Sequence, residues 1–267
     1  AVSPGVAEVG YNRIDDDCDG LIDEGFPPKI AVLNGNLCNI TLNTLNQPLF
    51  CNIVGGAGGY RWKVTTMSGP SAGEVQFLDT MLRTMRLSQL TNFAYDTTYK
   101  VEVAVYFAGF LQPFTESTCT VTTPVPVAQL STCNANIFTM NDWVYCNIVP
   151  FATGYRFRIT DPLNPANVAI VDNLLRNVRM TQITSFEVKF NKTYNVEVAV
   201  RNTNGSYLPF GPACSITTPQ FPTVSLIDTH CENSEGNAFD VPSMNFQILA
   251  ASYPGVSKYV FKVTGPG

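Results

Sequence analysis

Tyr60-Arg-Trp-Lys-Val-Thr65 returns further along the chain as Tyr155-Arg-Phe-Arg-Ile-Thr160. Apolar and polar side chains alternate in both copies, which is the pattern of a β-strand with one buried face. The second copy lies 95 positions after the first. A repeat of this length matches a β-sandwich domain with its own core, so the stretch predicts two copies of one small β domain.

Two more elements repeat at the same spacing. Thr98-Tyr-Lys-Val-Glu-Val-Ala-Val105 returns as Thr193-Tyr-Asn-Val-Glu-Val-Ala-Val200, and Cys119-Thr-Val-Thr-Thr-Pro124 returns as Cys214-Ser-Ile-Thr-Thr-Pro219. Tyr259-Val-Phe-Lys-Val-Thr264 matches the opening stretch a third time. No segment has a convincing helical period. The sequence therefore predicts an all-β chain of tandem seven-stranded sandwiches.

Proline-rich joints divide the chain. We expect a leader at residues 1–28, a first repeat at 29–124, a second at 125–219 and a partial third at 220–267. Runs of β-forming residues between turn signals predict the strands of the first repeat. They are 30–33, 49–54, 60–66, 74–78, 83–87, 97–107 and 118–123, with residues 55–59 as a turn.

The composition limits the possible functions. Of the 267 residues, 45% are apolar and 14% are charged, and the net charge is −5 without a basic run. This balance argues against nucleic acid and anionic membranes as partners, and no apolar run is long enough to span a membrane. The chain has one histidine, His230, which lies far from any motif. Catalysis by a histidine base or a histidine-activated nucleophile would depend on that residue, which we expect to be a surface or strand residue.

The acidic segment 15–24 predicts a calcium loop. Carboxylates at alternate positions, followed by a glycine that permits a sharp turn, provide the oxygen ligands that calcium prefers. Ile22 occupies the place of an apolar anchor in such loops. A solvated acidic linker is the alternative. The expected ligands are Asp15, Asp17, Asp19, the carbonyl of Leu21, and Asp23 or Glu24.

Eight cysteines indicate an oxidising compartment. Each full repeat has three at equal spacing, and the third repeat has a first cysteine, Cys231, without a second. This favours a bond between the first and third cysteines of each repeat, while a bond between the second and third stays open. The favoured bonds are Cys38–Cys119 and Cys133–Cys214, which leaves Cys51 and Cys146 as buried thiols.

The order of these motifs resembles fibronectin type III-like modules, and more narrowly the repeats of large surface proteins of gliding Bacteroidota exported by type IX secretion. In such modules the tyrosine before Val-x-Val forms a tyrosine corner, and Tyr99 and Tyr194 match it. The acidic segment resembles thrombospondin type 3 and related bacterial calcium repeats. Those repeats have a cysteine where this chain has Tyr11, so Cys18 lacks a local partner.

The resemblance implies an extracellular, non-enzymatic part of a surface adhesin or filament, serving as spacer and adhesive surface. Stalk modules of a larger secreted enzyme and a carbohydrate-binding module are the alternatives. The latter would need several exposed aromatic side chains together, and Trp62 and Trp143 are expected in the core or at its rim. The partial repeat lacks two of its expected strands. We expect it to be completed by further repeats of the same chain or by an identical subunit, and surface glycans are further possible partners.

Overall fold

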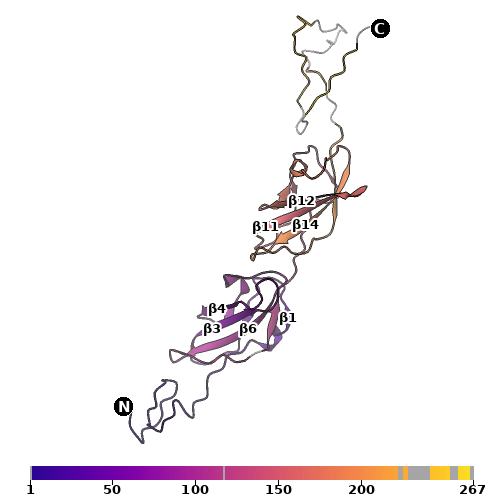
Figure 1. The fold of residues 1–267 in the computed structure, drawn as a ribbon. Helices are drawn as coiled ribbons and strands as arrows, with labels where there is room; N and C mark the ends of the chain where they lie inside the picture. The colour runs from indigo at the N-terminus through magenta and orange to yellow at the C-terminus, as the bar shows by residue number, and fades with distance from the viewer. Residues whose placement is uncertain (1, 117, 222–224, 228–240, 253–257, 265–267) are drawn as a thin grey trace. The chain divides into compact units, whose positions relative to one another are not determined.

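A computed structural model of the chain describes residues 2–116, 118–221, 225–227, 241–252 and 258–264. The chain divides into two compact units, residues 1–126 with 202–208 and residues 127–201 with 209–267. Both units are built from β-strands and short loops, with three single 3₁₀ turns in the described part (Figure 1). None of the helices in the described ranges has the length and apolar character of a membrane span.

The first unit contains a large and a small sheet. The large sheet has the strand order β1 (Ile40–Thr41), β8 (Thr120–Thr122), β6 (Thr98–Phe107), β3 (Ala57–Thr66) and β4 (Val75–Thr80), with β7 (Phe110–Leu111) paired to β6. The small sheet pairs β2 (Leu49–Phe50) with β5 (Thr84–Met85), and a bridge between Leu33 and Cys51 extends it. A 3₁₀ turn, η1 (Gly35–Leu37), precedes β1, and η2 (Leu87–Gln89) follows β5.

The second unit has the same plan. Its large sheet has the order β12 (Asn164–Asn173), β11 (Gly154–Asp161), β14 (Thr193–Arg201), β15 (Cys214–Thr217) and β9 (Ala135–Asn136). Its small sheet pairs β10 (Val144–Tyr145) with β13 (Asn177–Val178), a bridge joins Leu130 to Cys146, and η3 (Met180–Gln182) follows β13. The chain is therefore an all-β protein with two sandwiches of one topology.

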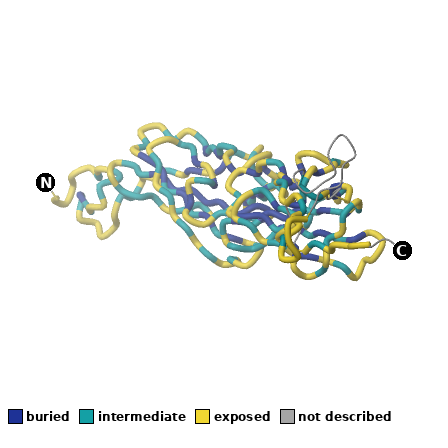
Figure 2. Tube along the Cα trace, turned by 90° about the horizontal axis from the view of Figure 1, so that it is seen from above, coloured by how far each residue is buried: buried dark blue, intermediate teal, exposed yellow. Residues whose placement is uncertain are grey.

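The core of the first unit lies between its sheets. Alternate side chains of β3 and β6 point inward, and Trp62, Val101 and Val103 are almost completely buried. Figure 2 shows buried stretches in the interior of the trace and exposed segments along its outer edges. On the outward face of the large sheet, Arg61 of β3 donates two hydrogen bonds, of 2.8 and 2.6 Å, to Asp79 of β4.

The first segment of each sandwich contacts both sheets, through a bridge to the small sheet and a short strand in the large sheet. In the first unit the chain bridges the small sheet at Leu33, crosses over, and continues as β1, which runs parallel to the last strand, β8. Cys38 lies beside this crossing and is bonded to Cys119, with 5.0 Å between their Cα atoms. Cys133 is bonded to Cys214 in the second unit. The structure thus joins the first and third cysteines, the pairing that the third repeat favours.

The tyrosine corners implied by the resemblance are present in both units. The Tyr99 hydroxyl accepts a 2.8 Å hydrogen bond from the backbone N–H of Ala94, and the Tyr194 hydroxyl accepts one of 2.9 Å from Lys189. Burial raises the pKa of Tyr99, which keeps its phenol neutral. The repeated Thr-Tyr-x-Val-x-Val motif therefore fixes the loop before the strand as well as the strand itself.

Several expected boundaries were wrong. The expected strand at 30–33 is one bridge at Leu33, and β1 and β7 were not expected. Part of the predicted turn at 55–59 belongs to β3, because its glycines permit close approach of a neighbouring strand. A Cβ atom on Gly59 would lie 3.2 Å from the carbonyl oxygen of Thr80, and one on Gly154 would lie 3.1 Å from that of Asn173.

The partial third repeat also differs from expectation. The expected strands at 246–249 and 259–263 are absent from the described residues, which show only a bridge between Leu226 and Ala250. A strand needs a neighbour for its backbone hydrogen bonds, and the described residues provide one such pairing. Val260 is 88% exposed. His230 and Cys231 lie outside the described residues.

Candidate metal centre

The acidic segment folds into a tight loop around its own carboxylates. Asp15 accepts hydrogen bonds from the N–H groups of Asp19 at 3.2 Å and Gly20 at 2.9 Å. Asp19 accepts one from the N–H of Leu21 at 2.8 Å. Gly20 has a φ of 94°, which only glycine adopts without strain. The alternation of acids and the glycine therefore produce the curled loop that the spacing predicts.

Two groups of carboxylates converge in this segment. Asp15, Asp17 and Asp19 each place one oxygen within 4.8 Å of the others, and so do Glu8, Asp17 and Glu24. Asp17 belongs to both groups. In the part of the chain that the structure describes, the three alternating acids thus form one group, and Glu24 joins Asp17 in the other.

Glu8 is the residue that sequence reasoning missed. It lies in the leader, seven positions before the first aspartate of the motif. Its two carboxylate oxygens accept 3.0 Å hydrogen bonds from the N–H groups of Asp16 and Asp23. The side chain therefore joins both ends of the acidic loop. An isolated acid outside the alternating motif gave no signal that could have identified it.

Asp23, one of the two expected closing ligands, binds backbone N–H groups instead. Its two oxygens accept hydrogen bonds from the N–H groups of Asn12 at 3.0 Å and Arg13 at 3.3 Å, and it is in neither carboxylate group. Leu21 contributes its N–H to the loop. Ile22 is 60% exposed, so it is no buried anchor. Of the two candidates for the closing ligand, Glu24 is the one that faces the other acids.

The charge of the Glu24 carboxylate is only partly compensated within the protein. A backbone hydrogen bond lowers its pKa, but desolvation and the charges of Glu8, Asp19 and Asp17 outweigh that bond, so its pKa is raised above the ordinary value. Its Oε2 atom is shielded from solvent and has no hydrogen-bond partner within the described protein. A bound cation or a water would satisfy a shielded carboxylate oxygen of this kind.

The donor set fits a hard divalent cation. The two groups consist wholly of carboxylates, and hard cations such as calcium prefer oxygen ligands. The five acidic side chains of the two groups repel one another, and a bound cation would reduce that repulsion. The residues present could therefore hold a metal ion.

Aromatic contacts join this segment to the first sandwich. The ring of Tyr11 lies 4.8 Å from that of Phe107 in β6 and 5.7 Å from that of Phe26. Arg13 donates a 3.0 Å hydrogen bond to the carbonyl of Leu111 in β7. Tyr11 is thus an aromatic anchor between this segment and the sandwich. Cys18 is an exposed free thiol.

No protein-family model matches the chain, and neither does any curated protein. Among solved structures it is similar to the chicken CNTN1 FN1–FN3 domains, with 14% identity and a TM-score of 0.27. That match covers 67% of this chain and 62% of the chicken structure. It is also similar to the fibronectin(III)-like modules of Clostridium thermocellum CbhA, with 8% identity and a TM-score of 0.23, over 72% of this chain and 95% of that one. The assignment of an all-β sandwich fold follows from the strands and registers described above.

Proposed function

We propose that the chain is part of an extracellular, non-enzymatic repeat array of the fibronectin type III-like kind, which serves as a spacer and adhesive surface in a cell-surface adhesin or filament. One observation carries the proposal, namely that two sandwiches share one strand order, one disulfide position and one tyrosine corner. Repetition of a whole structural module, with its internal bonds, suits a protein that must cover distance.

The disulfides support an oxidising location outside the cell. We take the repeats to be residues 29–124 and 125–219, preceded by the calcium leader at 1–28 and followed by the partial repeat at 220–267. Further repeats of the same chain, or identical subunits, are the proposed structural partners. Export by the type IX system of gliding Bacteroidota is the corresponding proposal for the route.

The intact mass of the native protein would test the array, since an array of further repeats requires a mass well above 29.2 kDa.

We propose calcium for the acidic loop, with Glu8, Asp15, Asp17, Asp19 and Glu24 as side-chain ligands. The carbonyl of Leu21 stays in the proposed set. The orphan Oε2 of Glu24 and the all-oxygen donors support this choice. The ion's role is structural, because it would neutralise repelling acids and stiffen the entry to the first sandwich.

Calcium titration of the full chain by calorimetry tests the metal site. Asp17→Asn should weaken binding at least tenfold, because Asp17 belongs to both carboxylate groups. Asp23→Asn is the matched control in the same loop, since it keeps one acceptor oxygen for Asn12 and should change affinity much less. Absence of calcium binding at millimolar concentration, or equal effects of the two substitutions, would contradict the assignment.

A further inference from the structure

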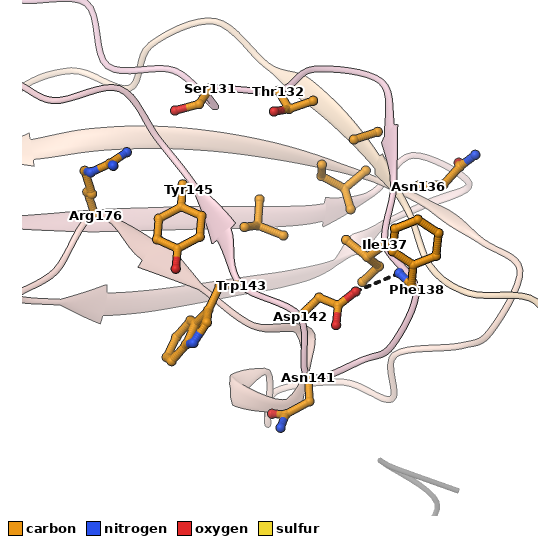
Figure 3. Close-up of a pocket in the computed structure, with 13 residues that line it drawn as sticks. Ser131, Thr132, Asn136, Ile137, Phe138, Asn141, Asp142, Trp143, Tyr145 and Arg176 are labelled. Carbon is orange, nitrogen blue, oxygen red and sulfur yellow. Dashed lines mark hydrogen bonds between the residues drawn. The ribbon is translucent and has the colours of Figure 1, made fainter.

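The second sandwich has a pocket of about 780 Å³ that belongs to none of the features above. It opens where β9 of the large sheet and β10 of the small sheet diverge, and buried Val144, Ile137 and Ile216 are among its lining residues. Figure 3 shows Ser131 and Thr132 on one side and Asn141 to Trp143 on the opposite side. Its volume lies in the range of about 300–1,000 Å³ typical of small-ligand sites.

The first sandwich provides an internal comparison for this pocket. Thr132 and Ala135 correspond, 95 positions earlier, to Leu37 and Ile40, which are partly buried and pack against the core of the first unit. Thr132 itself is exposed. The same fold can thus fill this region with its own side chains, so the scaffold does not require the pocket. The smaller residues of the second unit open it.

Three aromatic side chains surround the opening, and two of them, Phe138 and Trp143, have no aromatic counterpart in the first unit. Phe138, Trp143 and Tyr145 occupy the positions of Asn43, Pro48 and Phe50 in the first unit. They are 85%, 41% and 42% exposed. Three exposed aromatic rings at one pocket are the arrangement that sequence alone left open for a carbohydrate-binding module. Such rings provide a flat apolar surface at little cost in conformational entropy.

Two arginines hold aromatic rings of this rim in place. The guanidinium of Arg179 lies 3.4 Å from the centre of the Trp143 ring, and that of Arg176 lies 5.3 Å from the centre of the Tyr145 ring. Arg176 also donates a 2.6 Å hydrogen bond to the carbonyl of Cys146. The rings are therefore oriented before a ligand arrives, which lowers the entropy cost of binding.

The polar groups of the pocket make it suitable for a neutral ligand. The Asp142 carboxylate accepts hydrogen bonds from the N–H groups of Phe138 at 2.7 Å and Thr139 at 3.0 Å, and from the Thr139 hydroxyl at 2.6 Å. These hydrogen bonds stabilise the ionised carboxylate and lower the pKa of Asp142. The remaining polar side chains are hydroxyls and amides, which include Ser131 and Asn136, and the guanidinium of Arg176.

We propose that this pocket binds a neutral saccharide, with sugar C–H faces on the aromatic rings and hydroxyls bonded to the rim. A sugar ring combines an apolar face with many hydroxyls, which matches an apolar floor, exposed rings and a rim rich in hydroxyls and amides. Asp142 and Arg176 both have partners within the protein, since Asp142 accepts hydrogen bonds from Phe138 and Thr139 and Arg176 contacts the Cys146 carbonyl and the Tyr145 ring. The proposal is independent of the spacer function and of the calcium site.

The test uses the full chain and neutral tetrasaccharides of glucose, mannose, galactose or N-acetylglucosamine, titrated with tryptophan fluorescence as the readout. Trp143 is the accessible reporter, because Trp62, the other of the two tryptophans, is fully buried. At least one tetrasaccharide should shift the emission saturably. Thr132→Leu with Ala135→Ile copies the first unit and should weaken that binding at least tenfold, and Trp143→Ala should do the same by calorimetry.

The matched control is Leu37→Thr with Ile40→Ala in the first unit, which should leave saccharide affinity within twofold. Unchanged far-ultraviolet circular dichroism would show that each variant is folded. Failure of all four sugars at millimolar concentration would overturn the proposal, and so would undiminished binding by the filled variant. Self-association in sedimentation experiments that is lost in Trp143→Ala would instead identify a second copy as the occupant, and would also overturn it.

Discussion

Replacement of Tyr99 by phenylalanine should destabilise the first sandwich through one hydrogen bond. The hydroxyl accepts the N–H of Ala94 at 2.8 Å, and the two residues are 1% and 3% exposed. Loss of the oxygen leaves that N–H buried without this acceptor. An unsatisfied buried donor costs about 1–3 kcal/mol, so we expect the free energy of unfolding to fall by about 2 kcal/mol.

Tyr194→Phe is the matched change in the second sandwich. Its partner, the N–H of Lys189, belongs to an exposed residue, so water can replace the lost acceptor. The cost should then be that of an ordinary net hydrogen bond, about 0.5–1.5 kcal/mol. The same substitution should thus be costlier in the first unit.

Hydrogen exchange with mass spectrometry on the full chain measures both effects, because peptides from each repeat report the opening free energy of their own sandwich. Trp62 emission during urea unfolding gives a second measure for the first unit, whose core contains that ring. A cost below about 0.5 kcal/mol for Tyr99→Phe would refute the argument from burial. So would an equal or larger cost for Tyr194→Phe.

Non-reducing peptide maps should join the first and third cysteines of each repeat, and a bond between the first and second would contradict the fold described here. Iodoacetamide at pH 8 should label exposed Cys18 in the native protein but label Cys51 and Cys146 only after unfolding, because burial raises the pKa of each buried thiol to about 11. The second sandwich should lose stability as the pH falls below about 4, because the hydrogen bond from Lys192 lowers the pKa of buried Asp161 below its unfolded value. Asp161→Asn should flatten that part of the stability curve, and an unchanged curve would contradict this assignment.

The repeated motifs were sufficient to predict much of the fold. Alternation at Tyr60 to Thr65 identified a strand, and the recurrence of whole motifs identified two sandwiches. The absence of a second cysteine in the partial repeat favoured the cysteine pairing that the structure shows. These features are visible in sequence because period and spacing act along the chain.

Pairing between distant segments decided the rest. Neither the two-residue strand β1 nor its parallel pairing with β8 has a local signal, because such a short strand is defined by its neighbour. The close approach at Gly59 converted an expected turn into part of a strand for the same reason.

The same distinction applies to the candidate sites. The alternating acids predicted a cation loop, but only the folded chain brings Glu8 beside Asp17 and Glu24 and directs Asp23 to backbone N–H groups. The pocket at Trp143 depends on where two sheets diverge, which composition and spacing do not encode. The sequence by itself determined the repeated strands and the acidic loop, whereas tertiary contacts decided which side chains meet, because side-chain convergence depends on segments far apart in the chain.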